Sequence, residues 1–503
     1  MSSEHLEVER RYEVPAGARV PNLTALKGVR FIATGHEEVL EAVYYDTSSL
    51  ALLDAGITVR RRTGGSDAGW TLELPGGADT RTEISLPLAE GEAVPSELTD
   101  YVVAWTCGHP LRPAASLTTH RVDHRLLGAD ERVLAVFGDD HVTAHANTDD
   151  GAALLSEWRE WEFELVDGSR KLLERAGKLL PAAGARASLW PSKVHHAIGR
   201  QPITGTGGRV GPKSRAGDVL SAYLHEQVQV IRTRDHGVRT GDTDAVHKAR
   251  VATRRLRSTL AVYRPLLRRN LTDSIRDELA WFASALGALR DAHVQQEHLL
   301  AALAAEPGDL VLGAVAGRIN VELHANATSA QSTLLDVMTS DRYFHLLETL
   351  DELVGSPPTT GQARGQARKP MARGVNKALR RLTEKVALDA RPSPEGRDQR
   401  LHDIRKAAKR VRYAAEVSAP ALGRRADKWA ATAEEIQELL GEHQDSVVLR
   451  NTLRAIGVRM HLDGENPFTI GRLHALQQGR ADQAQAAFAR TWSKRFAKRL
   501  QPR

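Results

Sequence analysis

The sequence predicts an α+β protein of two domains, in which an N-terminal antiparallel β-barrel precedes an all-α duplicated helical bundle. Apolar and polar residues alternate along short segments of the first 200 residues, as in half-buried strands. Beyond residue 217, apolar residues recur every three or four positions, and one basic motif occurs twice. We place the domains at residues 1–200 and 217–503, with a Gly- and Pro-rich linker at 201–216 and helical halves at about 217–354 and 371–503.

The expected strands of the first domain carry charges at alternate positions. Glu7, Glu9 and Arg11 fall on one face of their strand, because alternate residues of a strand point the same way. Buried charges are unfavourable unless they are paired, so this pattern favours a barrel with a wet, charged interior. Amphipathic strands with their charges toward solvent are the alternative. The segments are 6–14, 41–45, 57–62, 70–74, 82–86, 132–136 and 158–165, with a helix expected near 169–180.

Other strands repeat this pattern with one sign of charge. Arg60 and Arg62 share a face, and so do three carboxylates of the last segment, Glu160, Glu162 and Glu164. Carboxylates gathered at one site suit a divalent cation, because Mg²⁺ takes oxygen ligands and is usually shared with substrate phosphates. Arginines gathered at another site suit a phosphate chain.

The basic motif of the second domain reads HKARVATRRLR at 247–257 and HDIRKAAKRVR at 402–412. On a helix, the His and three cations of each copy fall on one face, opposite Ala, Leu, Ile and Val. A solvated face is the usual explanation of one such stripe, but a second copy with the same His favours a polyanionic ligand. The residues are His247, Arg250, Arg254, Arg257, His402, Arg405, Lys409 and Arg412.

A second short motif follows each basic stripe at nearly the same distance. Leu286-Gly287 precedes Asp291, and Leu440-Gly441 precedes Asp445. The two histidines are 155 residues apart and the two aspartates 154, so the register is almost constant and indicates an internal duplication. We expect the aspartates to pair with arginines and to hold the basic helices in place.

The charge is divided unevenly between the two domains. Residues 1–200 hold 21 Lys+Arg and 30 Asp+Glu, whereas the rest of the chain holds 48 and 33. The second domain is therefore the one that faces an anion. A phosphate-rich polyanion is the expected partner. Nucleic acid is disfavoured because aromatic residues make up only 5% of the chain and none interleaves the stripe to stack on bases.

The compartment is also constrained by the sequence. The chain has one cysteine, no visible signal peptide and no apolar run of the ~20 residues that would cross a bilayer. We therefore expect a cytoplasmic protein without a membrane partner. Protein partners and oligomeric state are left open.

The charged motifs together resemble two known families. Leu6-Glu7-Val-Glu9-Arg-Arg11 resembles the Glu-x-Glu-x-Lys signature of CYTH domains, the triphosphate tunnel metalloenzymes, with Arg in place of Lys. The repeated half resembles a CHAD domain, a conserved-histidine α-helical domain that is often fused to CYTH and binds inorganic polyphosphate. The further CYTH-like motifs follow in the family's order: Tyr45-Asp46-Thr47, Arg60–Arg62, Arg81-Thr-Glu83, Asp139-Asp140, Trp161–Leu165 and Ser192-Lys193.

The resemblance implies an eight-stranded antiparallel tunnel that hydrolyses inorganic triphosphate or short polyphosphate, beside a domain that binds polyphosphate. A metal-bound or metal-oriented water would attack the terminal phosphorus, with Glu7, Glu9 and Arg11 as the catalytic group. The implied metal is Mg²⁺ or Mn²⁺, held by Glu7, Glu9, Glu162 and Glu164. The implied phosphate-binding residues are Arg11, Arg60, Arg62, Arg81, Arg121 and Lys193.

The sequence departs from the family pattern on the phosphate-binding side. Glu73 stands where the family usually has Lys, and Thr118 and His120 stand where cations are common. Charge-assisted hydrogen bonds contribute ~1.5–3 kcal/mol each, so these changes weaken triphosphate binding. They favour the alternative of a non-catalytic polyphosphate-binding or targeting protein with a degenerate tunnel. Adenylate cyclase activity is known within the CYTH group, but nothing in the sequence marks a purine pocket.

Overall fold

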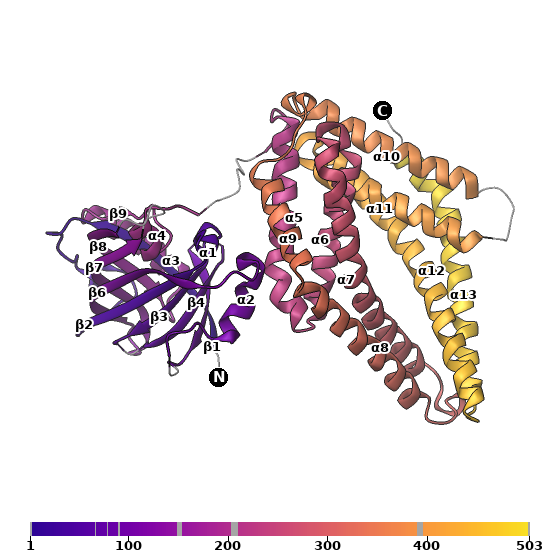
Figure 1. The fold of residues 1–503 in the computed structure, drawn as a ribbon, viewed down its shortest axis with the longest axis horizontal. Helices are drawn as coiled ribbons and strands as arrows, with labels where there is room; N and C mark the ends of the chain where they lie inside the picture. The colour runs from indigo at the N-terminus through magenta and orange to yellow at the C-terminus, as the bar shows by residue number, and fades with distance from the viewer. Residues whose placement is uncertain are drawn as a thin grey trace. The chain divides into compact units, whose positions relative to one another are not determined.

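The computed structural model describes residues 3–65, 67–77, 79–88, 91–147, 153–202, 210–389 and 396–500. The chain divides into two compact units, Met1–Thr204 and Gly205–Arg503. The first unit is built around one β-sheet and the second consists of helices, as the sequence predicts (Figure 1). Residues 203–209 of the linker predicted at 201–216 lie outside the described residues.

The sheet of the first unit closes into an eight-stranded antiparallel barrel. Its order is β5-β4-β3-β2-β6-β7-β8-β1, and β1 also pairs with β5. Strand β1 pairs with β8 over Glu9–Val14 and with β5 over Ser3–Val8, so one long strand joins both ends of the sheet. The predicted antiparallel barrel is therefore confirmed. The strands are β1 (Ser3–Val14), β2 (Phe31–Asp46), β3 (Thr58–Thr63), β4 (Gly69–Pro75), β5 (Thr80–Leu86), β6 (Arg112–Leu127), β7 (Val133–Asn147) and β8 (Ala153–Leu165), with a short β9 (Arg186–Ala187) beside β1.

The alternation along these strands separates an apolar face from a charged one. Tyr12, Phe137 and Trp161 are fully buried in a core that α3 (Arg170–Ala182) covers from outside the barrel. Their strand neighbours Arg11 and Glu162 are also buried, but they are paired with each other on the opposite face. The charged faces therefore lie inside the barrel, and the amphipathic alternative with charges toward solvent is wrong for these strands.

Short helices complete the barrel. Helix α4 (Lys193–Ile198) packs Val194 and Ala197 against Leu117 of β6 and Ala144 of β7, and its first residue brings a cation to the charged face. Helices α1 (Ala51–Asp54) and α2 (Ser96–Thr106) and the 3₁₀ turn η1 (Leu23–Ala25) were not predicted. Each is too short to show a helical period clearly.

The second unit contains two related sets of helices. Helix α6 holds the first basic motif and packs against α7, while α11 holds the second and packs against α12. Each of the long helices α7 and α12 continues into a hairpin, with α8 and α13 respectively (Figure 1). The helices are α5 (Ala216–Arg239), α6 (Thr243–Val262), α7 (Arg269–Ala304), α8 (Val315–Met338), α9 (Asp341–Gly355), α10 (Arg368–Asp389), α11 (Arg397–Leu422), α12 (Arg424–Leu462), α13 (Phe468–Thr491) and α14 (Ala497–Arg499). Shorter turns are η2 (Arg264–Leu266), η3 (Gly308–Leu310), η4 (Gly361–Arg364) and the π-helical η5 (Trp492–Phe496).

The predicted apolar faces of the two basic helices are buried. Helix α6 begins after Asp242, whose carboxylate caps the backbone N–H of Asp244 at 2.9 Å. The residues buried opposite the basic stripes are Ala249, Ala252, Leu256 and Leu260 on α6, and Ile404, Ala407, Val411 and Ala415 on α11. No helix in the described ranges is both long enough and apolar enough to cross a membrane.

Candidate phosphate and metal sites

A cavity of about 1190 Å³ in the helical unit is lined by both copies of the basic motif. Seven of the eight predicted residues line it, and Arg257 does not. Arg412 is already paired, with Glu416 at 2.8 Å and Glu434 at 2.9 Å. Five further cations line the cavity, of which the first three lie inside the motif itself: Lys248, Arg255, Lys406, Arg234 and Arg290. They were not predicted from the sequence.

The Gly-x-x-x-Asp motif supports the arginines of this cavity. Arg250 Nη2 lies 3.0 Å from Asp291 Oδ1, and a Cβ atom at Gly287 would lie 3.7 Å from the Arg250 guanidinium. In the second copy, a Cβ at Gly441 would lie 3.4 Å from the guanidinium of Arg405. The glycines leave room for the two guanidinium groups against α7 and α12. The pairing expected of Asp291 with an arginine is confirmed.

The cations of the cavity repel one another in the absence of a ligand. Burial, together with Arg254, Arg405 and Arg250, lowers the pKa of Lys409 to about 6. Burial also lowers the pKa of His247 and of His402, with Arg290 and Lys406 respectively as the next contributors. A polyanion would relieve this repulsion and would favour the charged forms.

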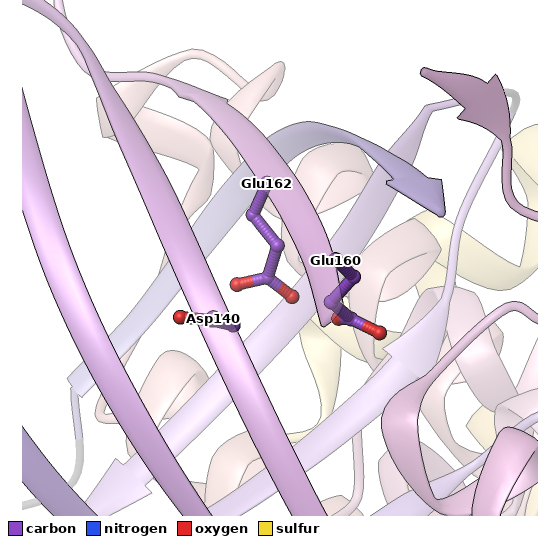
Figure 2. A group of neighbouring side chains, drawn as sticks. All are labelled: Asp140, Glu160 and Glu162. Atoms are coloured by element: carbon purple, nitrogen blue, oxygen red, sulfur yellow. The ribbon is translucent and has the colours of Figure 1, made fainter. Parts of the chain in front are cut away.

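The interior of the barrel holds an acidic group around one lysine. Asp140 of β7 and Glu160 and Glu162 of β8 bring carboxylate oxygens within 4.8 Å of one another (Figure 2). The ammonium of Lys193 lies 2.9 Å from both Asp140 and Glu160 and also contacts Glu162. Figure 2 shows the two glutamates on one strand and Asp140 on its neighbour. This group can hold a metal ion by its donor set, but Lys193 neutralises it in this structure.

Glu162 is bound by three cations. Arg11 Nε lies 2.9 Å from Glu162 Oε1, and Arg121 and Lys193 contact the same carboxylate. Burial alone would raise the pKa of Glu162, but Lys193, Arg11 and Arg121 outweigh it and hold the pKa well below its usual range. Glu9 of the predicted metal quartet is paired as well, with Arg11 at 3.0 Å and Arg81 at 2.8 Å.

Two of the predicted metal ligands are less neutralised, Glu7 on β1 and Glu164 on β8. Glu9 faces Glu164 across the strand pair. Burial and the charges of Glu9 and Glu73 raise the pKa of Glu7 to about 9, and burial with Glu9 raises that of Glu164 to about 7. Glu7 Oε2 is buried and has no hydrogen-bond partner among the described residues. Carboxylate oxygens that lack a counter-cation fit a hard divalent ion such as Mg²⁺ or Mn²⁺.

The predicted phosphate-binding arginines are held by carboxylates. Glu73 bridges two of them, because its Oε1 accepts from Arg60 at 2.6 Å and its Oε2 lies 3.3 Å from Arg81. Arg62 pairs with Asp67, whose side chain is 55% exposed. Arg81 also lies 2.8 Å from Glu9.

Backbone and acidic groups hold the other cations of the barrel. Arg121 pairs with Asp140 through both Nε and Nη2, at 2.7 and 2.6 Å. The carbonyl of Pro191 accepts hydrogen bonds from Arg11, at 3.2 Å, and from Arg81. Each of the six predicted phosphate-binding cations thus has a carboxylate partner within the barrel unit.

Two of the expected departures do not lie in the barrel interior. His120 is exposed and its ring accepts or donates a hydrogen bond with Glu37 at 2.9 Å, whereas the next residue, Arg121, points inward to Asp140. Thr118 is on the same side of β6 as His120, because alternate residues of a strand share a face. The expectation that Thr118 and His120 remove cations from the tunnel is therefore wrong. Of the three departures, Glu73 is the one that changes its interior charge.

Comparison with known proteins agrees with this architecture. The CYTH domain family matches residues 5–189, and the CHAD domain family matches residues 222–454. Two uncharacterized proteins of Mycobacterium tuberculosis, MT2285 and Rv2226, are each 37% identical over 489 residues, which is 94% of this chain and 93% of theirs.

Among solved structures, PptA from Streptomyces chartreusis is 26% identical with a TM-score of 0.48, and it covers 56% of this chain and 100% of its own. The CHAD domain from the plant Ricinus communis is 22% identical with a TM-score of 0.45, covering 57% and 94%. On the two domain matches and the near-full-length relatives, the chain belongs to the family of proteins that carry a CYTH domain followed by a CHAD domain.

Proposed function

We propose that this protein binds inorganic polyphosphate in its helical unit and hydrolyses triphosphate or short polyphosphate, with a divalent metal, in its barrel. The observation that carries the proposal is the cavity lined by both copies of the basic motif. Its cations are undercompensated, since burial and mutual repulsion lower the pKa of Lys409, Arg250 and Arg405. A flexible chain of phosphates supplies the missing negative charge along the whole cavity.

In the barrel, Glu7, Glu9 and Glu164 would hold the metal, with the Lys193-bound group of Asp140, Glu160 and Glu162 beside them. When bound, Mg²⁺ or Mn²⁺ polarises phosphoryl oxygens and lowers the pKa of a coordinated water. Arg62 would bind phosphate oxygens most readily, because its partner Asp67 is largely exposed and can be displaced by a ligand. Arg11 and Arg121 would fix Glu162 and neutralise charge that develops on the leaving phosphate.

Release of phosphate from inorganic triphosphate tests the catalytic half of the proposal. The full-length protein should release phosphate with Mg²⁺ or Mn²⁺, and a Glu7→Gln/Glu9→Gln variant should lose this release. The double substitution is suitable because it removes two carboxylate charges while leaving the side chains almost unchanged in size. Equal release by both proteins would exclude these residues from the metal site.

A second function is favoured by the pairing of all six predicted phosphate-binding cations with protein carboxylates. In that case the barrel has no turnover and the protein is a polyphosphate-binding scaffold. The same assay separates the two, since a scaffold would release no phosphate above the double variant while it still bound polyphosphate.

Binding by the helical unit is tested separately. Arg250→Ala with Arg405→Ala should abolish polyphosphate binding, because both guanidinium groups line the cavity. The matched control is Arg480→Ala with Arg490→Ala, which removes the same charge from exposed positions of α13. Equal loss in both variants would mean that only net charge matters. Competition with single-stranded nucleic acid at matched ionic strength measures selectivity.

A further inference from the structure

Glu73 occupies an unusual place in the barrel interior. It lies on β4 between a guanidinium from β3 and one from β5, with Arg60 Nη1 at 2.6 Å and Arg81 Nη1 at 3.3 Å. Its residue is only 3% exposed, so the carboxylate cannot turn out to solvent without breaking these contacts. Its cross-strand neighbour on β3 is Thr58.

Glu73 is therefore a fixed anion. Burial opposes its ionisation, but Arg60 and Arg81 outweigh the burial and lower the pKa of Glu73 to about 2. A carboxylate between two guanidinium groups takes the donors that a phosphoryl group would otherwise accept from. Any phosphate chain that enters the barrel meets this negative charge at Arg60 and Arg81.

Arg62 is held less firmly by protein carboxylates than Arg60 and Arg81. Arg62 lies two residues after Arg60 on the same face of β3, and its partner Asp67 is mostly exposed. Burial and the neighbouring charge of Arg60 lower the pKa of Arg62, so its positive charge is undercompensated. Arg62 is therefore more available to a phosphate than Arg60 and Arg81, which Glu73 holds.

We propose that Glu73 takes the place of one phosphoryl group and shifts the preference of the barrel from triphosphate toward diphosphate. This inference rests on the proposed hydrolysis in the barrel and moves its preferred substrate from triphosphate to the shorter diphosphate. Glu73 acts as a specificity-determining residue: it excludes the third phosphate by occupying its arginines and by repelling its charge.

The test compares kcat/KM for inorganic diphosphate and triphosphate with Mg²⁺, in the full-length wild type and in Glu73→Gln. The wild type should prefer diphosphate, and Glu73→Gln should raise the triphosphate-to-diphosphate ratio by about tenfold or more. Glu83→Gln is the matched control. Glu83 is the cross-strand neighbour of Glu73 and lies 3.8 Å from Arg60, but it does not bridge the two arginines. Removing its charge should therefore change the triphosphate-to-diphosphate ratio much less.

Three outcomes overturn the inference: a wild type that prefers triphosphate tenfold or more, an unchanged ratio in Glu73→Gln, or an equal change in Glu83→Gln. The wild-type comparison decides the matter even if Glu73→Gln does not fold. If neither ligand is hydrolysed by any variant, the proposed hydrolysis fails instead. The dissociation constants of diphosphate and triphosphate then decide which ligand the barrel prefers. They are measured in the Arg250→Ala/Arg405→Ala variant, so that the helical cavity does not contribute to binding.

Discussion

Lys409 in the second basic motif occupies the position of Arg254 in the first, and both side chains line one cavity. The pair differs in one chemical respect. An arginine keeps its proton at every accessible pH, whereas burial and the charges of Arg254, Arg405 and Arg250 lower the pKa of Lys409 to about 6. On α12, Asp445 is the carboxylate that acts against this shift.

Polyphosphate binding should take up a proton at Lys409. A bound polyanion raises the pKa of the lysine. The affinity for polyphosphate should therefore fall as the pH rises from about 6 to about 8, by no more than about tenfold per pH unit. Lys409→Arg keeps the charge and cannot titrate, so its affinity should depend less on pH. His247 and His402 titrate with the same sign in both proteins and cancel in the comparison. Dissociation constants of wild type and Lys409→Arg for polyphosphate, measured across this pH range, test the prediction. The same pH dependence in both proteins would show that Lys409 does not take up the proton.

The same lysine affects stability without ligand. Its folded pKa lies below the unfolded value near 10.5, so the unfolded state binds more protons between about pH 6 and pH 10.5. The contribution of Lys409 to the free energy of unfolding should therefore increase with pH over that window. Urea titrations of wild type and Lys409→Arg at several pH values measure the difference.

Filling the space at Gly441 should weaken polyphosphate binding. A leucine there would displace the guanidinium of Arg405, because even a Cβ atom would lie 3.4 Å from it. We expect about a tenfold loss of affinity for Gly441→Leu. Gly479→Leu is the control, since a Cβ at this helical glycine of α13 meets nothing within 4 Å. Similar affinities for the two variants would show that the glycine does not position Arg405.

Replacing Lys193 with an uncharged residue should destabilise the barrel and should make its stability depend on a bound metal cation. Lys193→Met leaves Asp140, Glu160 and Glu162 buried around an uncharged side chain. Breaking a buried ion pair in this way costs about 3–5 kcal/mol. Mn²⁺ should restore more stability to this variant than to the wild type, because the three carboxylates already lie within 4.8 Å of one another. Thermal unfolding with and without Mn²⁺ measures the effect, and an equal shift in both proteins would argue against it.

Asp46 should prove structural although it belongs to a CYTH-like motif. Its carboxylate is buried and accepts hydrogen bonds from the backbone N–H groups of Thr47, Leu52 and Leu53 at 2.7 to 2.9 Å. Asp46→Ala would leave these donors unsatisfied, at about 1–3 kcal/mol for each that stays buried. Chemical denaturation should show this loss, whereas Asp100→Ala, at an exposed position of α2, should change stability little.

Alternation and helical period were sufficient to predict which residues share a face. They placed Arg11 inside the barrel and Leu256 in the helical core. They did not predict strand β6, whose polar residues occur on both faces, or the partners of each charge. Lys193 at the start of α4 contacts Glu162 of β8, 31 residues earlier in the chain. A contact over that separation cannot be predicted from the spacing of neighbouring residues.

Three residues were predicted at the wrong place: Arg257 in the helical unit, and Thr118 and His120 in the barrel. A helical wheel gives the direction of a side chain but not its surroundings, and Arg257 lies outside the cavity although Arg412, at the same position of the second motif, lines it. Thr118 and His120 were assigned to the interior by family alignment, although Arg121 next to them must point the other way in a strand. Glu73 was identified correctly as a change of charge inside the barrel, and the adjacent strands supply the two arginines that fix it.

The two basic helices that line one cavity, α6 and α11, have a consequence for how a ligand can be oriented. A linear chain of identical phosphates reads the same from either end, unlike a nucleic acid or a peptide. A cavity built from two copies of one motif offers nearly the same groups to each half of such a chain. Polyphosphate could therefore enter in either direction, which doubles the productive encounters, whereas a polymer with distinct ends would fit only one way.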